Sequence, residues 1–537
     1  IPFFLDEVVP GSTHNVTTSV VARLQTLLNP IMDNMYLDTF YFFVPLRLVY
    51  DHTKQLFGEN DAGPWTRDKV AYRIPRLNYP APTETKLTGG FDVGSIADYF
   101  GVPVNVYLDP TVYADENFPS SLPFRAYALC VDQFFRDQNL QQPIVVHKDD
   151  TVRNGVLNRT VTGSDPGDPL WYVTDLELGG KPFKAARFHD YFSSCLPQPQ
   201  KSESVSIFGN FINQPTFAPV GSRNFNHTVL PNSSSLHVSG TGVGGYVRVG
   251  DPSGNLFAAE SSELPSVYPT NLWANLNIPE ATITNLRLAF QLQKYYERLG
   301  SSGSRYREYL AAFFGVNNGD ARMQIPEYLG GHRIPLSIHQ VANTGKGEGA
   351  ALGDLGAMSN TSDVHEDFHM SFSEHGYIIG LCCVRYDNTY SQGLPKLFSR
   401  REALHFYNPT FAHISNQPVF RREISLGLEN TPGGAITPDN VFGYQEAWAD
   451  YRYGRSLCTA EMRPEVSNSL ASWHLADDYE YAPSLSEEWI MTDQNTVDRV
   501  LAVTSQVSNQ IFADFFITDE TVQPMPVHSI PGLADHF

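Results

Sequence analysis

Residues 36–44 constrain the fold more than any other segment of the chain. They read YLDTFYFFV, and only Asp38 and Thr39 among them are polar. Aromatic and β-branched residues favour a strand, and alternate residues of a strand point to opposite faces. One face carries Leu37, Tyr41 and Phe43, and the other carries Tyr36, Phe40, Phe42 and Val44. Such a strand must be covered on both faces, by its own domain or by neighbouring copies, and Pro45 is expected to end it.

Helical periodicity is limited to three segments, which lie among short apolar runs of strand type. Apolar residues recur with helical spacing over 124–135, 283–293 and 306–313. Pro123 suits the first turn of the first helix, while Gly300 and Gly315 are expected to follow the other two. Strands are predicted at 378–385, 419–428, 499–504 and 510–518. Strands so far apart in sequence predict a mainly β fold, and a jelly roll with long insertions fits because its sheets tolerate long connections.

The 537-residue chain carries little charge for its aromatic content. Charged residues make up 18% of the sequence and aromatic residues 12%, including 34 Phe and 27 Tyr. Charged residues usually form about a quarter of a globular protein. Large subunit interfaces would explain the difference, because their cores lose charge and gain aromatic residues. The alternative is a β-rich monomer with a large core.

The net charge of −21 argues against a surface that binds nucleic acid everywhere, because phosphate contacts need clustered Lys and Arg. It leaves room for a local basic face. Arginine beside aromatic residues can hold phosphate and stack on unpaired bases. The alternative is ion pairing with carboxylates, within the protein or across subunits. The candidate DNA-facing residues are Arg298, Arg305, Arg307, Arg400, Arg401, Arg421, Arg422, Arg452, Arg455 and Arg463.

Two short motifs resemble those of enzymes, but neither has the expected context. His365 and His369 fit H-E-x-x-H, a zinc signature that requires a helix. The apolar alternation around them predicts a strand, which would hold the two histidines roughly 13 Å apart, too far for one zinc ion. Residues 240–245 fit G-x-G-x-x-G, yet a strand and a turn are expected to follow instead of a helix. The turn at 165–169 offers two carboxylates and is interpreted as a turn without an ion. We therefore expect no catalytic residue, no metal and no cofactor.

The five cysteines indicate a chain made in a reducing compartment. Cys130, Cys195 and Cys458 stand alone, and Cys382 and Cys383 are adjacent within a predicted strand. Neighbours in a strand point to opposite faces, so these two are not expected to pair. No apolar run approaches the roughly 20 residues that span a membrane.

Residues 201–275 differ in composition from their flanks. They are rich in Ser, Gly, Asn and Pro, with short β-type runs at 204–208, 236–239 and 245–250. This pattern predicts a surface insertion with hairpins, and the alternative is a long loop without a partner. The predicted organisation is one domain with insertions: residues 1–200 with a helix near 124–139, the insertion 201–275, and residues 276–537 with helices and the rest of the core.

Six segments together resemble the major capsid protein of small single-stranded DNA bacteriophages, the Microviridae of the gokushovirus branch. The segments are 7–11 (EVVPG), 36–44, 286–291 (LRLAFQ), 326–331 (PEYLGG), 374–380 (EHGYIIG) and 531–537 (PGLADHF). The resemblance implies an eight-stranded jelly roll and a T=1 icosahedral shell of sixty copies, built from pentamers around circular single-stranded DNA.

The same resemblance implies the partners and the location of the protein. The partners are a small basic DNA-packaging protein inside the shell, a DNA pilot protein and a receptor on the bacterial surface, and the shell would assemble in the host cytoplasm. In similar capsids, an insertion near 201–275 forms a threefold protrusion, which makes this segment the candidate for host contact. Its candidate residues are Val229, Asn232, Ser235, His237, Thr241 and Tyr246.

The function predicted from the sequence is therefore structural. We expect a capsid protein that assembles, protects a genome and attaches to a host without bond-making chemistry. Two other classes of protein are the alternatives. A free carbohydrate-binding jelly-roll protein should be small and monodisperse, and an H-E-x-x-H metallohydrolase should contain stoichiometric zinc.

Overall fold

The structure is a computed structural model, and it divides the chain into two compact units. Residues Ile1–Lys201 and Glu297–Phe537 form the first unit, and Ser202–Tyr296 form the second. In the second unit, β6 (Val249–Gly250) pairs antiparallel with β7 (Leu256–Phe257). The residues described are 1–59, 72–84, 86–157, 175–203, 205, 249–250, 256–257, 283–342, 344, 353 and 355–525.

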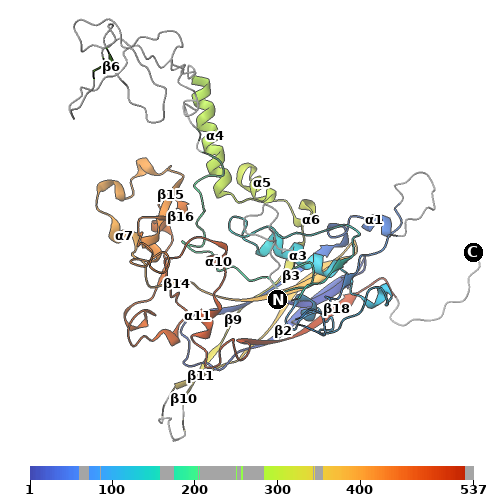
Figure 1. The fold of residues 1–537 in the computed structure, drawn as a ribbon. Coiled ribbons are helices and arrows are strands. Elements are labelled where there is room, and N and C mark those ends of the chain that lie inside the picture. The colour runs from blue at the N-terminus through green and yellow to red at the C-terminus, as the bar shows by residue number, and fades with distance from the viewer. Residues whose placement is uncertain are drawn as a thin grey trace, which may run out of the picture. The chain divides into compact units, whose positions relative to one another are not determined.

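Two antiparallel sheets form the centre of the first unit (Figure 1). The larger has the order β1-β13-β3-β8, with β9 also paired to β3, and the smaller has the order β12-β2-β18. The strands of the larger sheet are β1 (Pro2–Val8), β13 (Gly376–Tyr386), β3 (Met35–Pro45), β8 (Glu327–Gly330) and β9 (Arg333–Pro335). Those of the smaller sheet are β12 (Thr361–Ser371), β2 (Thr13–Leu24) and β18 (Ile511–Val522).

Aromatic side chains join the two sheets face to face. Tyr41 of β3 lies 5.5 Å, between ring centroids, from Phe368 of β12, and its hydroxyl bonds to that of Thr18 in β2 at 2.6 Å. Phe3 of β1 stacks on Phe515 of β18 at 4.3 Å. Such offset and edge-on ring contacts add stability beyond the buried area. The protein is therefore mostly β, with antiparallel sheets arranged as in a β-sandwich and some helices.

The other face of the larger sheet packs against helix α3 (Leu122–Cys130) and a π-helical turn that continues it over Val131–Phe135. Phe42 and Val44 of β3 lie in one apolar core with Phe124 and Tyr127 of α3. The prediction that the strand at 36–44 is covered on both faces is thus confirmed, and its own domain supplies both covers. Its end at Pro45 is confirmed as well.

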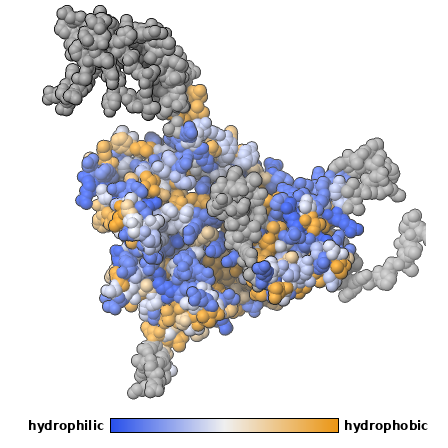
Figure 2. Space-filling model, in the orientation of Figure 1, coloured by the Kyte–Doolittle hydropathy of each residue, from blue (hydrophilic) through white to orange (hydrophobic). Residues whose placement is uncertain are grey.

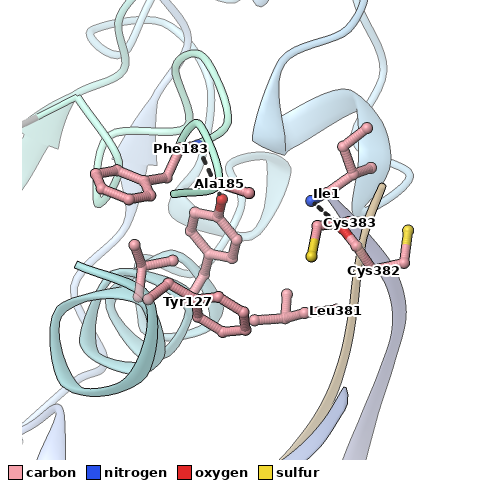
Figure 3. Close-up of a pocket in the computed structure, with 9 residues that line it drawn as sticks. Ile1, Tyr127, Phe183, Ala185, Leu381, Cys382 and Cys383 are labelled. Carbon is pink, nitrogen blue, oxygen red and sulfur yellow. Dashed lines mark hydrogen bonds between the residues drawn. The ribbon is translucent and has the colours of Figure 1, made fainter. Parts of the chain in front are cut away.

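A small cavity lies between α3 and the middle of β13, and Figure 3 shows its lining. Its volume of about 30 Å³ is roughly that of one water molecule. The Tyr127 hydroxyl accepts a hydrogen bond from the Phe183 amide at 3.1 Å. Cys382 and Cys383 leave the strand on opposite sides, as predicted, and all five cysteines are free. The cavity is a packing defect, too small for a substrate.

The remaining predicted helices are present. Helix α4 (Ile283–Ser301) and helix α5 (Tyr306–Phe314) match the periodicity. Gly315 ends α5 with a left-handed φ of 68°, as predicted, but Gly300 does not end α4, which continues through it to Ser301. The short helices are α1 (Thr53–Leu56), α2 (Ile96–Tyr99), α6 (Asp320–Met323), α7 (Lys396–Ser399), α8 (Arg421–Ile424), α9 (Ala449–Arg452), α10 (Glu487–Ile490) and α11 (Gln494–Asp498). The short strands are β4 (Leu77–Asn78), β5 (Arg153–Asn154), β10 (Ile338–Ala342), β11 (Leu355–Ser359), β14 (Thr389–Tyr390), β15 (Asn416–Phe420), β16 (Val441–Glu446) and β17 (Ser456–Leu457).

Two of the four further strand predictions are confirmed and two are wrong. The runs 378–385 and 510–518 lie in β13 and β18. The run 419–428 is a strand only to Phe420, because the Glu423 carboxylate accepts the Phe420 amide at 3.0 Å and closes the helical turn α8. The run 499–504 is a turn and loop with one isolated bridge from Leu501 to Leu27, because the amides of Val500 and Leu501 bond back to the end of α11.

Candidate functional site

Three short helices bring most of the predicted arginines into one region of the first unit. Arg400 follows α7, and its guanidinium forms an ion pair with Asp450 of α9. Arg455 donates to the Glu423 carbonyl oxygen of α8 at 2.6 Å. These bonds link α7, α8 and α9, which the sequence separates by up to fifty residues.

Several of these side chains are engaged by groups of the protein itself. Arg421 donates to the Asn430 side chain at 2.5 Å, Arg422 pairs with Asp439, and Arg463 bonds to the Ser391 carbonyl oxygen. Burial lowers the pKa of Arg455, because desolvation disfavours its charged form. For these arginines the structure favours the alternative to DNA contact, in which each guanidinium bonds to groups of its own chain.

The other predicted arginines lie around the break between α4 and α5. Arg305 donates to the Asp132 carbonyl oxygen at 2.5 Å, and burial lowers its pKa. Arg307 lies over the Phe134 ring at 5.0 Å, with Asp320 3.7 Å away, and exposed Arg298 lies over Phe313. Arg305 and Arg307 thereby hold α5 against the π-helical turn after α3.

A different part of the arginine set stays exposed among aromatic rings. Arg401 is exposed, and among the described residues its guanidinium has no ion-pair partner. The Arg452 side chain is 51% exposed. The exposed rings around them, 49–58% accessible, belong to Phe398, Phe406, Tyr407, Tyr451 and Tyr453. We call these seven residues the arginine–aromatic surface.

Contacts within the arginine–aromatic surface fix its rings in place. The largely buried guanidinium of Arg400 lies 4.2 Å from the centroid of the Tyr451 ring. The Tyr451 hydroxyl accepts the Tyr407 amide at 3.2 Å, and Trp448 meets the Tyr407 ring edge-on at 5.6 Å. Figure 2 shows hydrophobic and hydrophilic residues mixed over the part of the molecule where Figure 1 places α7. Exposed rings held in this way can stack on flat ligands.

A cleft with a volume of about 570 Å³ borders the arginine–aromatic surface. Arg452 and Tyr453 lie on its wall, and the Glu446 carboxylate pairs with Arg452 at 2.8 Å. The remaining lining includes His189, Asp190 and Asn416. This mixture of one cation, two carboxylates and neutral polar groups does not define a single ligand charge.

The histidines of the H-E-x-x-H motif lie on strand β12, as predicted, and not on a helix. His365 is largely buried, whereas His369 is exposed. The structure places His365 beside Asp363, Asp367 and His332. Sequence reasoning missed His332, which is 33 positions away in the chain. The signal that it could have used is the Gly330-Gly331 pair before it, which predicts a close backbone approach.

Some predictions fall outside the described residues. These are the G-x-G-x-x-G match at 240–245, the turn at 165–169, and the candidate host-contact residues Val229, Asn232, Ser235, His237, Thr241 and Tyr246. Among the residues that are described, no helix is long and apolar enough to cross a membrane.

Fold and surface together indicate the class of this protein. Its two sheets enclose a core of their own, and the arginine–aromatic surface exposes two arginines and five aromatic rings. Arginine and aromatic residues are enriched where proteins contact one another, which points to a protein that acts through contacts of its surface.

Comparison with known proteins identifies the family. Residues 1–533 match the model of the family described as capsid protein (F protein). The capsid protein VP1 of Spiroplasma virus 4 is 34% identical over 99% of this chain and 92% of its own length, and that of Chlamydia phage 1 has the same values. Capsid protein VP1 of Bdellovibrio phage phiMH2K is 33% identical over 100% of this chain and 92% of its own. The chain belongs to this family of phage capsid proteins.

Membership of this family confirms the resemblance found in the sequence. The protein is a structural capsid protein of the virion and not an enzyme. Neither of the other two classes, the free carbohydrate-binding protein and the metallohydrolase, agrees with a family match that covers nearly the whole chain.

Proposed function

We propose that sixty copies of this chain form a T=1 icosahedral shell of eight-stranded jelly rolls around circular single-stranded DNA. The family match over residues 1–533 carries this proposal. Two packed antiparallel sheets with five and three strands support a jelly-roll core, because that fold consists of two such sheets. The low charge and high aromatic content support large contacts between copies, with pentamers as the intermediate of assembly in the host cytoplasm.

We further propose that the arginine–aromatic surface contacts the packaged DNA. Unpaired bases stack on exposed tyrosine and phenylalanine rings, and nearby guanidinium groups bind the phosphates. Arg401 and Arg452 are the residues of this surface whose charged groups reach solvent. The chain carries a net charge of −21 and DNA is also negative, so we expect a small basic packaging protein as a partner that neutralises part of this charge.

Changing Arg401 and Arg452 together to Ala tests both proposals. The particles should keep the megadalton mass of the wild type, because neither side chain holds the core together. Their DNA should be released at a lower salt concentration, because phosphate contacts are lost. Each lost contact should also reduce the slope of log K against log salt concentration by about one unit. Light scattering measures the particle mass, and DNA release measured over a salt series gives the second quantity.

Arg298→Ala is the matched control: Arg298, also predicted to face DNA, is exposed, but its guanidinium donates to the Ala312 carbonyl oxygen and lies outside the arginine–aromatic surface. Its particles should release DNA as the wild type does. A stable 60.0 kDa monomer in native material would contradict the shell. If the double variant no longer assembled, the arginine–aromatic surface would instead lie between copies, where aromatic and arginine residues are also enriched.

We propose that residues 201–275 project from the shell at the threefold axes and bind the bacterial receptor, while a DNA pilot protein joins the particle separately. The Ser, Gly, Asn and Pro content between core-like flanks supports this, because binding segments are often loops on a rigid scaffold. The candidate contact residues run from Val229 to Tyr246.

Replacing residues 229–242 by a short Gly/Ser linker should yield particles that assemble and hold DNA but adsorb poorly to host cells. Closing a loop of this length costs little, so the core should fold as before. Adsorption is measured as the fraction of particles removed by host cells, with wild-type particles beside it. Failure of assembly would show that the segment completes contacts between copies, and normal adsorption would move attachment to another surface.

A further inference from the structure

The turn between β8 and β9 touches strand β12 so closely that side chains have no room there. A Cβ atom at Gly330 would lie 2.2 Å from the Asp367 carbonyl oxygen of β12. A Cβ atom at Gly331 would lie 2.1 Å from the Thr39 carbonyl oxygen of β3. Glycine permits this approach, and the next residue, His332, is fixed by two backbone hydrogen bonds to Thr39. The turn therefore places His332 of one sheet against β12 of the other.

Four side chains meet at this point. His365 Nδ1 lies 3.3 Å from an Asp363 carboxylate oxygen, and His332 Nε2 lies 3.7 Å from the same oxygen. The two imidazole rings lie 4.4 Å apart. On the far side of His365, Nε2 lies 3.1 Å from a carboxylate oxygen of Asp367. Asp363 and His365 are two residues apart and share one face of β12, while Asp367 lies at the β-bulge between Glu366 and Phe368.

The His365 side chain is largely buried, and the two carboxylates beside it lie at ion-pair distance but outside good hydrogen-bond geometry. Its side chain is 9% exposed, and neither ring nitrogen makes a hydrogen bond of acceptable geometry. Asp367 is fully buried, and one of its carboxylate oxygens also lacks a hydrogen bond, while Thr18 donates to the other. Buried polar atoms are normally hydrogen-bonded, so this group calls for an explanation such as a bound ion.

His14 shows what a satisfied buried histidine looks like in the same sandwich. It lies near Asp6 and Asp519, so these three residues could also face one ion. Yet both of its ring nitrogens have partners, Asp519 at 2.7 Å and the Ser12 hydroxyl at 3.1 Å. In that cluster the histidine is fully hydrogen-bonded and only one oxygen of Asp519 is not, whereas both ring nitrogens of His365 lack a hydrogen bond.

From these contacts we infer a binding site for a divalent transition-metal ion, with zinc as the best fit, whose ligands are His332 Nε2, Asp363 and His365 Nδ1. The three donor groups already lie within 4.8 Å of one another. Tetrahedral zinc with bonds near 2.0–2.1 Å needs donors about 3.3 Å apart. The His332 side chain is 51% exposed and can tilt to close the remaining gap.

The chemistry of the four groups selects the type of ion and the role of Asp367. Imidazole suits zinc, copper and nickel, while calcium and magnesium prefer oxygen ligands alone. A histidine that binds a metal commonly donates its other N–H to a carboxylate, which orients the ring. Asp367 lies where that carboxylate is needed and acts as a positioning residue. The fourth position of the ion faces the exposed side of His332 and is left for water or a group of another copy.

This site differs from the H-E-x-x-H site considered from the sequence, and it replaces the expectation that the chain binds no metal. His369 has no part in it, and His332 takes the second histidine position. The ion would connect the β8–β9 turn to β12 and so hold the two sheets together at one edge. An ion that binds only the folded protein stabilises it in proportion to the logarithm of its concentration over Kd.

The test is equilibrium dialysis of purified wild-type particles against Zn²⁺, with the bound metal counted by mass spectrometry. We expect one ion per chain, and Co²⁺ in its place should give the visible absorption of a tetrahedral site. His332→Gln and Asp363→Asn should each remove this ion, and because both residues are partly exposed, the particles should still assemble. Asp367→Asn should weaken affinity about 10- to 100-fold without changing the ligand set.

His369→Gln is the matched control, because His369 lies on the same strand but outside the cluster. It should bind zinc as the wild type does. Wild-type particles that bind no more zinc than the Asp363→Asn particles would overturn the inference. So would an equal loss of zinc in His369→Gln, which would point to unspecific binding by exposed histidines. A melting temperature that does not rise with zinc would also overturn it, because an ion bound only by the folded protein must stabilise it.

Discussion

Changing Asp477 to Ala should lower the free energy of unfolding by about 3–5 kcal/mol, because it leaves a buried guanidinium without its counter-charge. Arg187 Nη1 lies 2.5 Å from an Asp477 carboxylate oxygen, and the side chains are only 6% and 3% exposed. The Tyr479 hydroxyl donates to the same carboxylate at 2.5 Å. Burial by itself would lower the pKa of Arg187, but Asp477 outweighs it and raises that pKa. The Arg187 guanidinium is therefore charged in the folded protein.

Unfolding of the dissociated subunit in denaturant measures this effect. Tryptophan fluorescence reports it locally, since Arg187 lies 5.2 Å from the Trp489 ring. Glu446→Gln is the control, because it breaks an ion pair with Arg452 whose partners are about half exposed. That variant should lose no more than about 1 kcal/mol. Similar losses in the two variants would show that the Arg187–Asp477 pair is open to water in solution.

The fold could be predicted where local pattern and burial agree. Residues 36–44 are apolar on both faces, and the sandwich core and α3 cover both, so the pattern alone identified a central strand. The run 419–428 is just as apolar in places, yet the Glu423 side chain turns it into a helix after Phe420. A single side-chain bond of this kind leaves no periodic signal in the sequence.

The candidate sites show a different limit. Arginine beside aromatic residues was a correct description of the segment around Arg400, but its partner Asp450 follows 50 positions later, and only the fold shows which guanidinium groups are occupied. His365 was found through a motif whose second histidine lies elsewhere. The true neighbour, His332, comes from a different sheet, and chain spacing carries no information about contacts between sheets.

Changing Phe42 to Ala should cost about 3–5 kcal/mol and prevent most of the chain from accumulating as soluble, assembly-competent protein. Phe42 is 1% exposed and lies where the larger sheet meets its helical cover. Its ring centroid is 4.7 Å from that of Phe134 and 5.6 Å from that of Tyr328. Truncation removes the ring and leaves a cavity between elements that cannot close over it, since β3 is paired on both sides.

Two further variants separate the cavity from a general effect of losing an aromatic ring. Phe42→Leu keeps most of the apolar volume and should cost less than about 1.5 kcal/mol. Phe314→Ala removes a ring that is 64% exposed at the end of α5 and should change stability by no more than about 0.5 kcal/mol. The denaturant midpoints of the three soluble variant subunits rank their stabilities, and the yield of assembled particles is measured beside them. In the structure, α3 covers the face of β3 that the smaller sheet leaves open. If the Phe42→Ala subunit were as stable as the Phe314→Ala subunit, this face would have to be buried by neighbouring copies and not by α3.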